Sequence, residues 1–321
     1  MELTVDPRME LLTALEFLSG FANPGFVSLT KLEPDYKKEF VDHFSPYKNG
    51  RAIRRYVSMC HGSFPLNVSG AVMFNLSRPP ELRIMRPFAR DRRFFEEFAG
   101  VAKEFSDETG FAAFFKAHEE MFGRVEETAR EAIRTRDVVP PLEDYYGMKL
   151  DSYSVLLAPL FREGGNGFRI MGAGGGYDGF AIIGPTEVRG SLPYFGRQQV
   201  RTLWHEFSHH IVEPLKERMR GRLRPRFSKF GFAVRGYAGW ENMVDEYVIR
   251  AVCNRIDARI NGEGRVLDWM KGEERGGFTC MTDLYRSLEA YESDRKKYPK
   301  FADFYPELVK ELEGLLGKQQ K

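Results

Sequence analysis

The segment 200–212 reads VRTLWHEFSHHIV and places metal-binding residue types at a spacing that one helix can use. His205, Glu206 and His209 form an HExxH motif, and no helix-breaking residue interrupts the segment. Residues four apart share one face of a helix, so both imidazoles can reach the same tetrahedral ion. Glu206 lies about 100° further round, where its carboxylate can reach a water on that ion. The pattern predicts a zinc site on a helix over 196–212.

A catalytic zinc ion needs a third protein ligand, and the segment 236–251 offers three acidic residues for that position. Apolar residues surround this segment on nearly every side, which predicts a buried helix. A buried carboxylate needs a metal, a hydrogen-bond network or a cation beside it. The three acids are Glu241, Asp245 and Glu246. The residues alone leave open which of them is the ligand, or whether all three form only salt bridges such as Glu246 with Arg250.

The rest of the chain predicts an α+β fold in three parts. Residues 1–145 have long apolar periods of 3.6 residues and predict a mainly helical region, with phenylalanines packed between helices. Residues 146–258 predict the catalytic core, and residues 259–321 predict a helical, charged C-terminal region. The prolines at 140–141 and Pro214 are expected to end the helices that precede them.

Three short apolar runs lie within the predicted core, before the HExxH segment. They span 152–161, 167–173 and 179–184, and glycine-rich turns separate them. Such runs predict an antiparallel meander of three strands. Earlier in the chain, the segment 67–82 breaks the helical period and predicts a loop, with room for one short strand.

An HExxH helix followed by a helix that carries a glutamate resembles the gluzincin branch of zinc metallopeptidases, to which thermolysin belongs. More closely, the chain is similar to a prokaryotic family of gluzincin-like domains of unknown function. The shared features are DPRMEL at 6–11, HEFSH at 205–209 and W…DEYVIRA at 240–251. The resemblance covers most of residues 3–255 and implies a zincin-like core, in which the edge strand of the meander pairs with an extended peptide.

The resemblance also favours one of the three acids as the third ligand. Glu246 matches the glutamate of the Asn-Glu pair on the second helix of gluzincins, although Asp245 stands where asparagine is usual. A second alignment makes Glu241 the ligand and lets Asp245 orient a zinc histidine. Glu241 and Glu246 point about 140° apart on a helix, so both cannot reach one ion. We adopt Glu246.

These residues predict a zinc metallopeptidase with one Zn2+ per chain and a peptide or protein substrate. Zinc would lower the pKa of its bound water to about 7, and Glu206 would accept the proton and pass it to the leaving amine. A second donor is expected at the developing oxyanion. Tyr237 is the first candidate for it, and Tyr177 is the second.

A non-catalytic binding protein on the same scaffold is the alternative. The segment 216–235 holds eight basic residues and one acid, and it would then bind an acidic partner. The intact Glu206 favours the enzyme, because a binding protein has no need of a catalytic base. The formal net charge of +2 and the lack of a nucleic-acid-binding motif argue against a nucleic-acid partner.

Composition also bears on the compartment. Cys60, Cys253 and Cys280 are widely spaced and form no CxxC pair, which is typical of a reducing environment. No apolar run reaches 18 residues, and residues 1–12 lack the features of a signal peptide. We therefore expect a cytoplasmic protein without a membrane partner.

Overall fold

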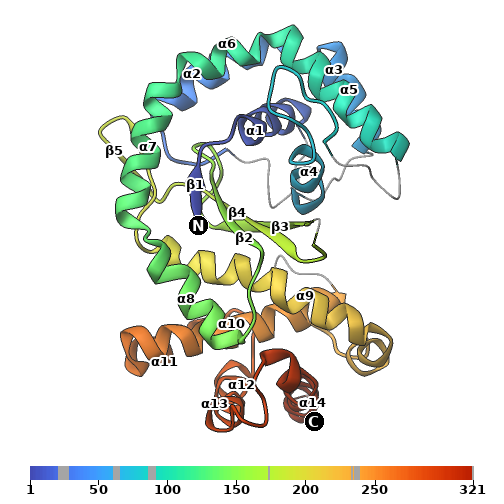
Figure 1. Ribbon diagram of the computed structural model, residues 1–321, viewed down its shortest axis with the longest axis vertical. Coiled ribbons are helices and arrows are strands. Elements are labelled where there is room, and N and C mark those ends of the chain that lie inside the picture. The colour runs from blue at the N-terminus through green and yellow to red at the C-terminus, as the bar shows by residue number, and fades with distance from the viewer. Residues whose placement is uncertain are drawn as a thin grey trace. The chain divides into compact units, whose positions relative to one another are not determined.

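The computed structural model describes residues 1–20, 29–60, 66–85, 92–172, 174–232, 234 and 239–319 (Figure 1). It is a mixed α and β structure with many helices and a small mixed sheet. The chain divides into two compact units that interleave along the sequence. The first contains Met1–Arg134 and Ser152–Thr202, and the second contains Thr135–Asp151 and Leu203–Lys321. The predicted division at residues 145 and 258 stays a prediction.

A four-stranded sheet lies in the first unit, in the order β1-β2-β4-β3. Its strands are β1 (Glu2–Thr4), β2 (Ser152–Leu157), β3 (Gly165–Met171) and β4 (Tyr177–Ile183). The hairpin of β3 and β4 is antiparallel, as the sequence predicts. However, β4 lies between β2 and β3 and runs parallel to β2, so the predicted antiparallel meander is wrong.

The burial of β2 explains this difference. Its last three residues, 155–157, are all buried, so side chains on both faces of the strand are shielded from water. A strand of this kind suits the interior of a sheet with parallel neighbours, and β1 and β4 supply them. Because β1 comes from the distant N-terminus, local sequence patterns carry no sign of this pairing.

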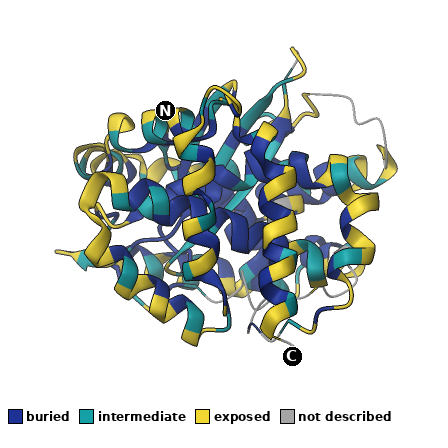
Figure 2. Cartoon of the chain, turned by 90° about the horizontal axis from the view of Figure 1, so that it is seen from below, coloured by how far each residue is buried: buried dark blue, intermediate teal, exposed yellow. Residues whose placement is uncertain are grey.

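Seven α-helices and the short 3-10 helix η1 (Ser45–Tyr47) accompany the sheet among the described residues of the first unit. The α-helices are α1 (Pro7–Ser19), α2 (Asp35–Phe44), α3 (Arg51–Cys60), α4 (Leu66–Met73), α5 (Arg92–Thr109), α6 (Phe111–Ala117) and α7 (Glu119–Ala132). A short hairpin of β5 (Glu187–Arg189) and β6 (Leu192–Tyr194) follows the sheet. Most of these helices alternate buried and exposed residues at helical spacing. Figure 2 colours the chain by burial, and many of its helices show dark blue and yellow segments along one ribbon. This pattern is the one that predicted a mainly helical region over 1–145, although it did not predict α4.

Helix α4 contradicts the first half of the loop predicted over 67–82, whereas residues 74–82 contain no helix. Its residues Leu66–Met73 are helical, and only an isolated bridge between Leu76 and Ile84 represents the expected strand. Packing explains the helix better than its local sequence does. A Cβ atom on Gly70 would come within 2.9 Å of the Phe168 ring on β3, so the glycine allows the helix to approach the sheet.

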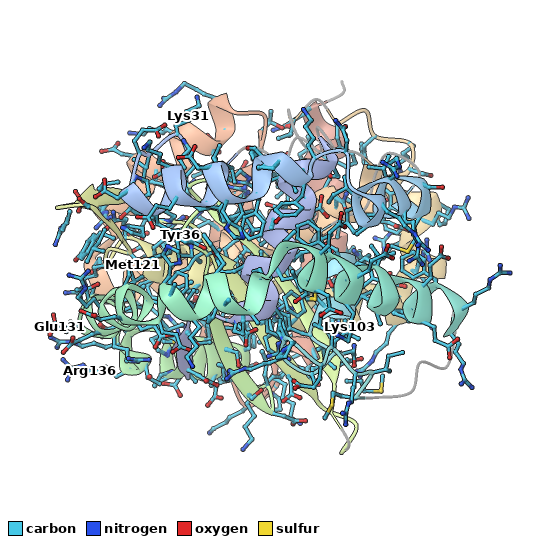
Figure 3. The ribbon with its side chains drawn as sticks, turned by 90° about the horizontal axis from the view of Figure 1, so that it is seen from above. Lys31, Tyr36, Lys103, Met121, Glu131 and Arg136 are labelled. Carbon is cyan, nitrogen blue, oxygen red and sulfur yellow. The ribbon has the colours of Figure 1, made fainter. Side chains whose placement is uncertain are left out.

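Two buried glutamates lie on α1 and bind tyrosine hydroxyls from neighbouring helices. Tyr36, labelled in Figure 3, donates a 2.6 Å hydrogen bond to Glu10 Oε2, and Tyr56 donates to Glu16 Oε1. Burial raises the pKa of each glutamate to about 7, although the tyrosine hydrogen bonds act in the opposite direction. Both acids therefore hold their protons well above the usual range.

The described residues of the second unit form helices and the segments that connect them, without a strand. The unit contains α8 (Thr135–Tyr146), most of α9 (Gln199–Phe227), α10 (Gly239–Asn261), α11 (Glu263–Arg275), α12 (Met281–Ser287), α13 (Glu289–Ser293) and α14 (Phe301–Gln319). Helix α10 is buried along most of its length, as predicted, and it contacts α8, α11, α12 and α14. In the described part of the chain, no helix combines the length and apolar character that a membrane span requires.

Prolines do not end the helices as expected. Pro140 and Pro141 lie inside α8, and Pro214 and Pro225 lie inside α9. An interior proline costs about 3 kcal/mol, so tertiary packing must offset it. One tertiary link is the 3.1 Å hydrogen bond from Trp204 Nε1 on α9 to a backbone carbonyl on α8. Buried apolar side chains near the prolines supply the rest: Val138, Leu142, Leu215 and Leu223.

Candidate metal centre

Helix α9 presents His205 and His209 one turn apart on the same face. The helix forms here because apolar residues alternate with them at helical spacing and are buried: Leu203, Trp204, Phe207 and Ile211. The histidine side chains retain 18% and 19% of their exposure, so they border the core rather than lie within it. Their ring centroids are 5.0 Å apart. This is the placement that the HExxH spacing predicts.

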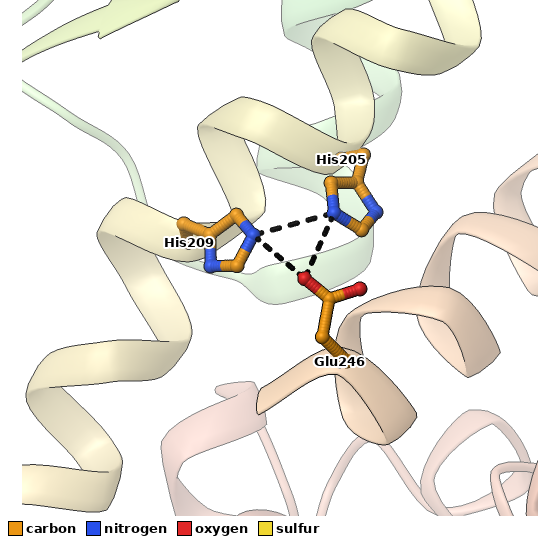
Figure 4. A group of neighbouring side chains, drawn as sticks. All are labelled: His205, His209 and Glu246. Atoms are coloured by element: carbon orange, nitrogen blue, oxygen red, sulfur yellow. Dashed lines mark hydrogen bonds and ion pairs between the residues drawn. The ribbon is translucent and has the colours of Figure 1, made fainter. Parts of the chain in front are cut away.

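Glu246 on α10 approaches both histidines with one carboxylate oxygen (Figure 4). Its Oε1 atom lies 3.4 Å from His205 Nε2 and 3.4 Å from His209 Nε2. The two Nε2 atoms are 3.3 Å apart. The three atoms therefore form a nearly equilateral triangle, with the glutamate side chain only 6% exposed.

The size of this triangle fits a tetrahedral metal ion. Two ligand atoms that each lie about 2.0–2.1 Å from zinc are about 3.3 Å apart at a tetrahedral angle. A direct hydrogen bond between nitrogen and oxygen is shorter, with a mode of about 2.9–3.0 Å. The observed spacings of 3.3 and 3.4 Å thus suit one face of a zinc coordination sphere better than a set of direct hydrogen bonds.

Electrostatic interactions among the three side chains shift the pKa values of Glu246 and His209. Burial by itself would raise the pKa of Glu246, but His205 and His209 outweigh burial and hold that pKa well below its usual range. Burial would lower the pKa of His209, yet the neighbouring carboxylates of Glu213 and Glu246 raise it well above the usual value. The group therefore keeps an ionised carboxylate against the histidines, and this ionised form is the one that binds a cation.

Glu213 is a site residue that the sequence analysis missed. Its Oε1 atom lies 3.5 Å from Nδ1 of His209, on the ring edge opposite Nε2. A carboxylate at Nδ1 favours the tautomer with a proton there, which leaves the Nε2 lone pair free for a metal. The signal in the sequence is the spacing of four residues between His209 and Glu213 on one helix.

Arg250 is a second site residue whose role the sequence did not reveal. The sequence analysis considered its salt bridge with Glu246 only as an alternative to metal binding by that glutamate. In the structure, Glu246 contacts Arg250 and the histidines at the same time, because each contact uses a different oxygen of its carboxylate. Arg250 donates a 3.0 Å hydrogen bond from Nε to Glu246 Oε2, while Oε1 faces the histidines. The salt bridge thus does not compete with the histidines.

The other two acids of α10 lie elsewhere. Glu241 pairs with Arg220 at 2.8 Å, and its side chain is 35% exposed. Asp245 forms an ion pair with Lys216 rather than orienting a histidine, and burial raises the pKa of Asp245 to about 6 despite that lysine. The structure brings Glu246, and neither of its rivals, to the histidines.

Of the three candidate catalytic residues, the structure describes Glu206 and Tyr177. Glu206 follows His205 on α9 and is 7% exposed, and its charge adds to the raised pKa of His209. Tyr237 lies outside the described residues. Tyr177 begins β4 in the first unit, where Arg169 stacks on its ring at 5.1 Å.

Comparison with known proteins assigns a family. Residues 87–311 match the family described as Domain of unknown function (DUF4932), and the chain belongs to that family. The match covers the whole candidate metal centre. No match was found among curated proteins or among solved structures.

Proposed function

We propose that this protein is a zinc-dependent peptidase of the gluzincin type, with His205, His209 and Glu246 as zinc ligands. The triangle of three ligand atoms at tetrahedral spacing is the observation that carries the proposal. Three protein ligands leave one coordination position open, which is typical of catalytic rather than structural zinc sites. Among the described residues, this is the one group of three or more such side chains that could hold an ion.

Each side chain then has a defined task. The two histidines and Glu246 hold the ion, and Glu213 keeps His209 in the tautomer that can bind it. Bound zinc supplies a Lewis acid that polarises a peptide carbonyl and makes a water molecule more acidic. Glu206 accepts the proton from that water as it attacks the carbonyl, and then passes the proton to the leaving amine.

The order of elements supports a zincin-like core as part of the proposal. A small sheet with the antiparallel edge strand β3 precedes the histidine helix, and the glutamate helix follows it. An edge strand can pair with an extended peptide, which is the substrate class that we propose.

The binding-protein alternative has less support. Four of the eight basic residues in the segment 216–235 are already in ion pairs within the second unit. Lys216 pairs with Asp245, Arg220 pairs with Glu241, and Arg226 and Lys229 both pair with Glu313. Much of the segment therefore holds α9 to neighbouring helices and is not available to an acidic partner.

Metal analysis combined with a peptide-cleavage assay tests the proposal. Wild-type protein should contain one zinc ion per chain and should cleave members of a mixed peptide library. Glu206→Gln should keep the zinc and lose about 10²- to 10⁴-fold in rate, because glutamine cannot accept the proton. Glu217→Gln is the matched control, since Glu217 lies on α9 with a side chain that is 51% exposed.

Two results would overturn the proposal. The first is wild-type protein that takes up no zinc when zinc is supplied. The second is a Glu206→Gln variant that cleaves peptides at the wild-type rate.

A further inference from the structure

We propose that Arg250 is a positioning residue that makes Glu246 a one-oxygen ligand and so keeps the fourth coordination position open. This inference rests on the proposed function, because it assumes that the His–His–Glu group binds zinc. It concerns a different question, namely what prevents a carboxylate with two oxygens from occupying two positions on the ion.

The two oxygens of Glu246 have separate partners. Oε1 lies 3.4 Å from each histidine Nε2, whereas Oε2 lies 3.0 Å from both Nε and Nη2 of Arg250. The carboxylate is 6% exposed, so water has little access to either oxygen. Arg250 therefore holds the oxygen that would otherwise be free to turn toward a cation.

Arg250 is itself held in place from two sides. Its Nη1 atom lies 3.3 Å from Glu273 Oε1, and its guanidinium carbon lies 4.4 Å from the centre of the Phe278 ring. Glu273 comes from α11 and receives hydrogen bonds from Asn254 at 2.9 Å and from Trp269 at 3.2 Å. This network spans two helices and fixes the guanidinium before any metal arrives.

A guanidinium suits this position better than an ammonium group would. Its planar fork can contact Glu246 along one edge and Glu273 with the remaining nitrogen at the same time. A lysine has a single nitrogen on a flexible stem and would hold one carboxylate less firmly. The charge alone is therefore not sufficient; the shape of the group sets the orientation of Glu246.

The consequence appears when the arginine is removed. Glu246 Oε2 would then be a buried anionic oxygen without a donor, and a nearby metal ion would be its best available partner. Binding through both oxygens would raise the coordination number to five while a water molecule stays bound, and it would crowd the position that water and substrate need. Arg250→Met should thus change the coordination geometry as well as the affinity.

A plain salt bridge between residues four apart on a helix predicts something different. Such a pair contributes little to helix stability, and its loss would leave metal geometry unaltered. The test therefore needs a readout of geometry. Cobalt(II) provides it, since tetrahedral cobalt absorbs visible light far more strongly than five- or six-coordinate cobalt.

The experiment measures zinc affinity by chelator competition and the visible spectrum of the cobalt-loaded full chain. We expect Arg250→Met to lose about 10- to 100-fold in zinc affinity and to show weaker cobalt absorption. Arg250→Lys should recover part of the affinity and little of the spectrum. Arg220→Met is the matched control: it removes an arginine from an ion pair with a different glutamate of α10, Glu241, and should match wild type in both measurements.

The outcomes separate this inference from the proposed function. Wild-type protein that binds neither ion refutes the proposed function. Wild-type protein that binds both ions, together with an Arg250→Met variant of unchanged affinity and spectrum, refutes the role of Arg250 alone. If Arg250→Met does not fold, Glu273→Gln weakens the anchor of Arg250 without touching Glu246, and an unchanged cobalt spectrum in that variant also refutes the role.

Discussion

Buried glutamates occur in both units, and their surroundings give them opposite charge states. Glu10 and Glu16 on α1 are 0% and 2% exposed, and Glu246 on α10 is 4% exposed. The first two accept hydrogen bonds from tyrosine hydroxyls, and burial raises the pKa of each to about 7. Burial acts on Glu246 in the same direction, but the two histidines reverse its effect and lower the pKa.

The comparison shows that burial does not by itself mark a metal ligand. A glutamate beside a tyrosine can remain a neutral acid, which satisfies a hydroxyl but attracts no cation. Glu246 is held as an anion by its basic neighbours before a metal binds. The neighbours of a buried carboxylate, rather than its depth, therefore decide whether it can serve as a ligand.

The largest effect is expected from replacing the metal-facing glutamate by glutamine. The same substitution at a tyrosine-bound glutamate is the comparison. Glu246→Gln removes one of three protein ligands, and a third of the binding free energy of about 10–16 kcal/mol is about 4 kcal/mol, or about a thousandfold in zinc affinity. Glu10→Gln should leave zinc affinity at the wild-type value. Chelator competition measures both. Glu241→Gln is the sharper control, because a loss as large as that of Glu246→Gln would assign the third ligand to Glu241.

A second test concerns Asp245, a buried acid whose pKa lies between the raised values of Glu10 and Glu16 and the lowered value of Glu246. Asp245 pairs with Lys216, their side chains are 4% and 7% exposed, and the pKa of Asp245 is raised to about 6. Lys216→Met should lower the free energy of unfolding by about 3–5 kcal/mol at pH 8, because it leaves a buried charge without its partner. Urea denaturation measures this loss.

The double variant Lys216→Met/Asp245→Leu provides the control for this pair. It removes both charges and should regain most of the lost stability, since a buried ion pair contributes little beyond an apolar pair of similar volume. If the single and double variants are equally unstable, packing around Lys216, rather than its charge, explains the effect.

The sequence predicted the parts of the site that depend on local spacing. The HExxH motif placed His205 and His209 on one helical face, and the apolar surroundings of 239–258 predicted a buried partner helix. The third ligand stayed open because helix rotation is set by packing. Glu241 and Glu246 are both possible from spacing. The structure distinguishes them, because Glu246 lies 3.4 Å from both histidines and Glu241 pairs with Arg220.

The errors in fold prediction have the same origin. Local rules ended α8 and α9 at prolines, but contacts between the helices offset the lost hydrogen bonds. Pattern rules predicted that consecutive strands pair, but the N-terminal β1 and the central position of β4 changed the order. Glu213 was missed because the HExxH motif concerns the metal-facing nitrogen of His209. It does not indicate which residue contacts the other nitrogen.

The pH dependence of stability tests the neutral glutamates of α1. The pKa of Glu10 is about 7 in the folded protein and near its ordinary value of 4.5 when unfolded, so the folded state binds the extra proton between these values. Its contribution is therefore complete below about pH 4.5 and is lost as the pH rises through 7. Between pH 5 and 8 the free energy of unfolding should fall by about 2–3 kcal/mol through this residue.

Glu10→Gln isolates that contribution from those of other groups that titrate in the same range. Glu16 and Asp245 also have raised pKa values, so their contributions to the free energy of unfolding also fall as the pH rises. The difference between wild type and Glu10→Gln removes their shared effect. Urea denaturation from pH 5 to 8 should give a flatter profile for the variant, and parallel profiles would show that Glu10 is ionised throughout this range.

The smallest expected effect concerns the hydroxyl that faces Glu10. Tyr36→Phe removes a 2.6 Å hydrogen bond, while Glu10 Oε1 already has no hydrogen-bond partner among the described residues. At pH 5 the carboxyl group is neutral, and we expect a loss of about 1 kcal/mol in the free energy of unfolding. At pH 8 the loss should be larger, because an ionised carboxylate depends more strongly on its donor. Denaturation of both proteins at the two pH values measures this difference, and an equal loss at pH 5 and 8 would contradict the neutral state of Glu10.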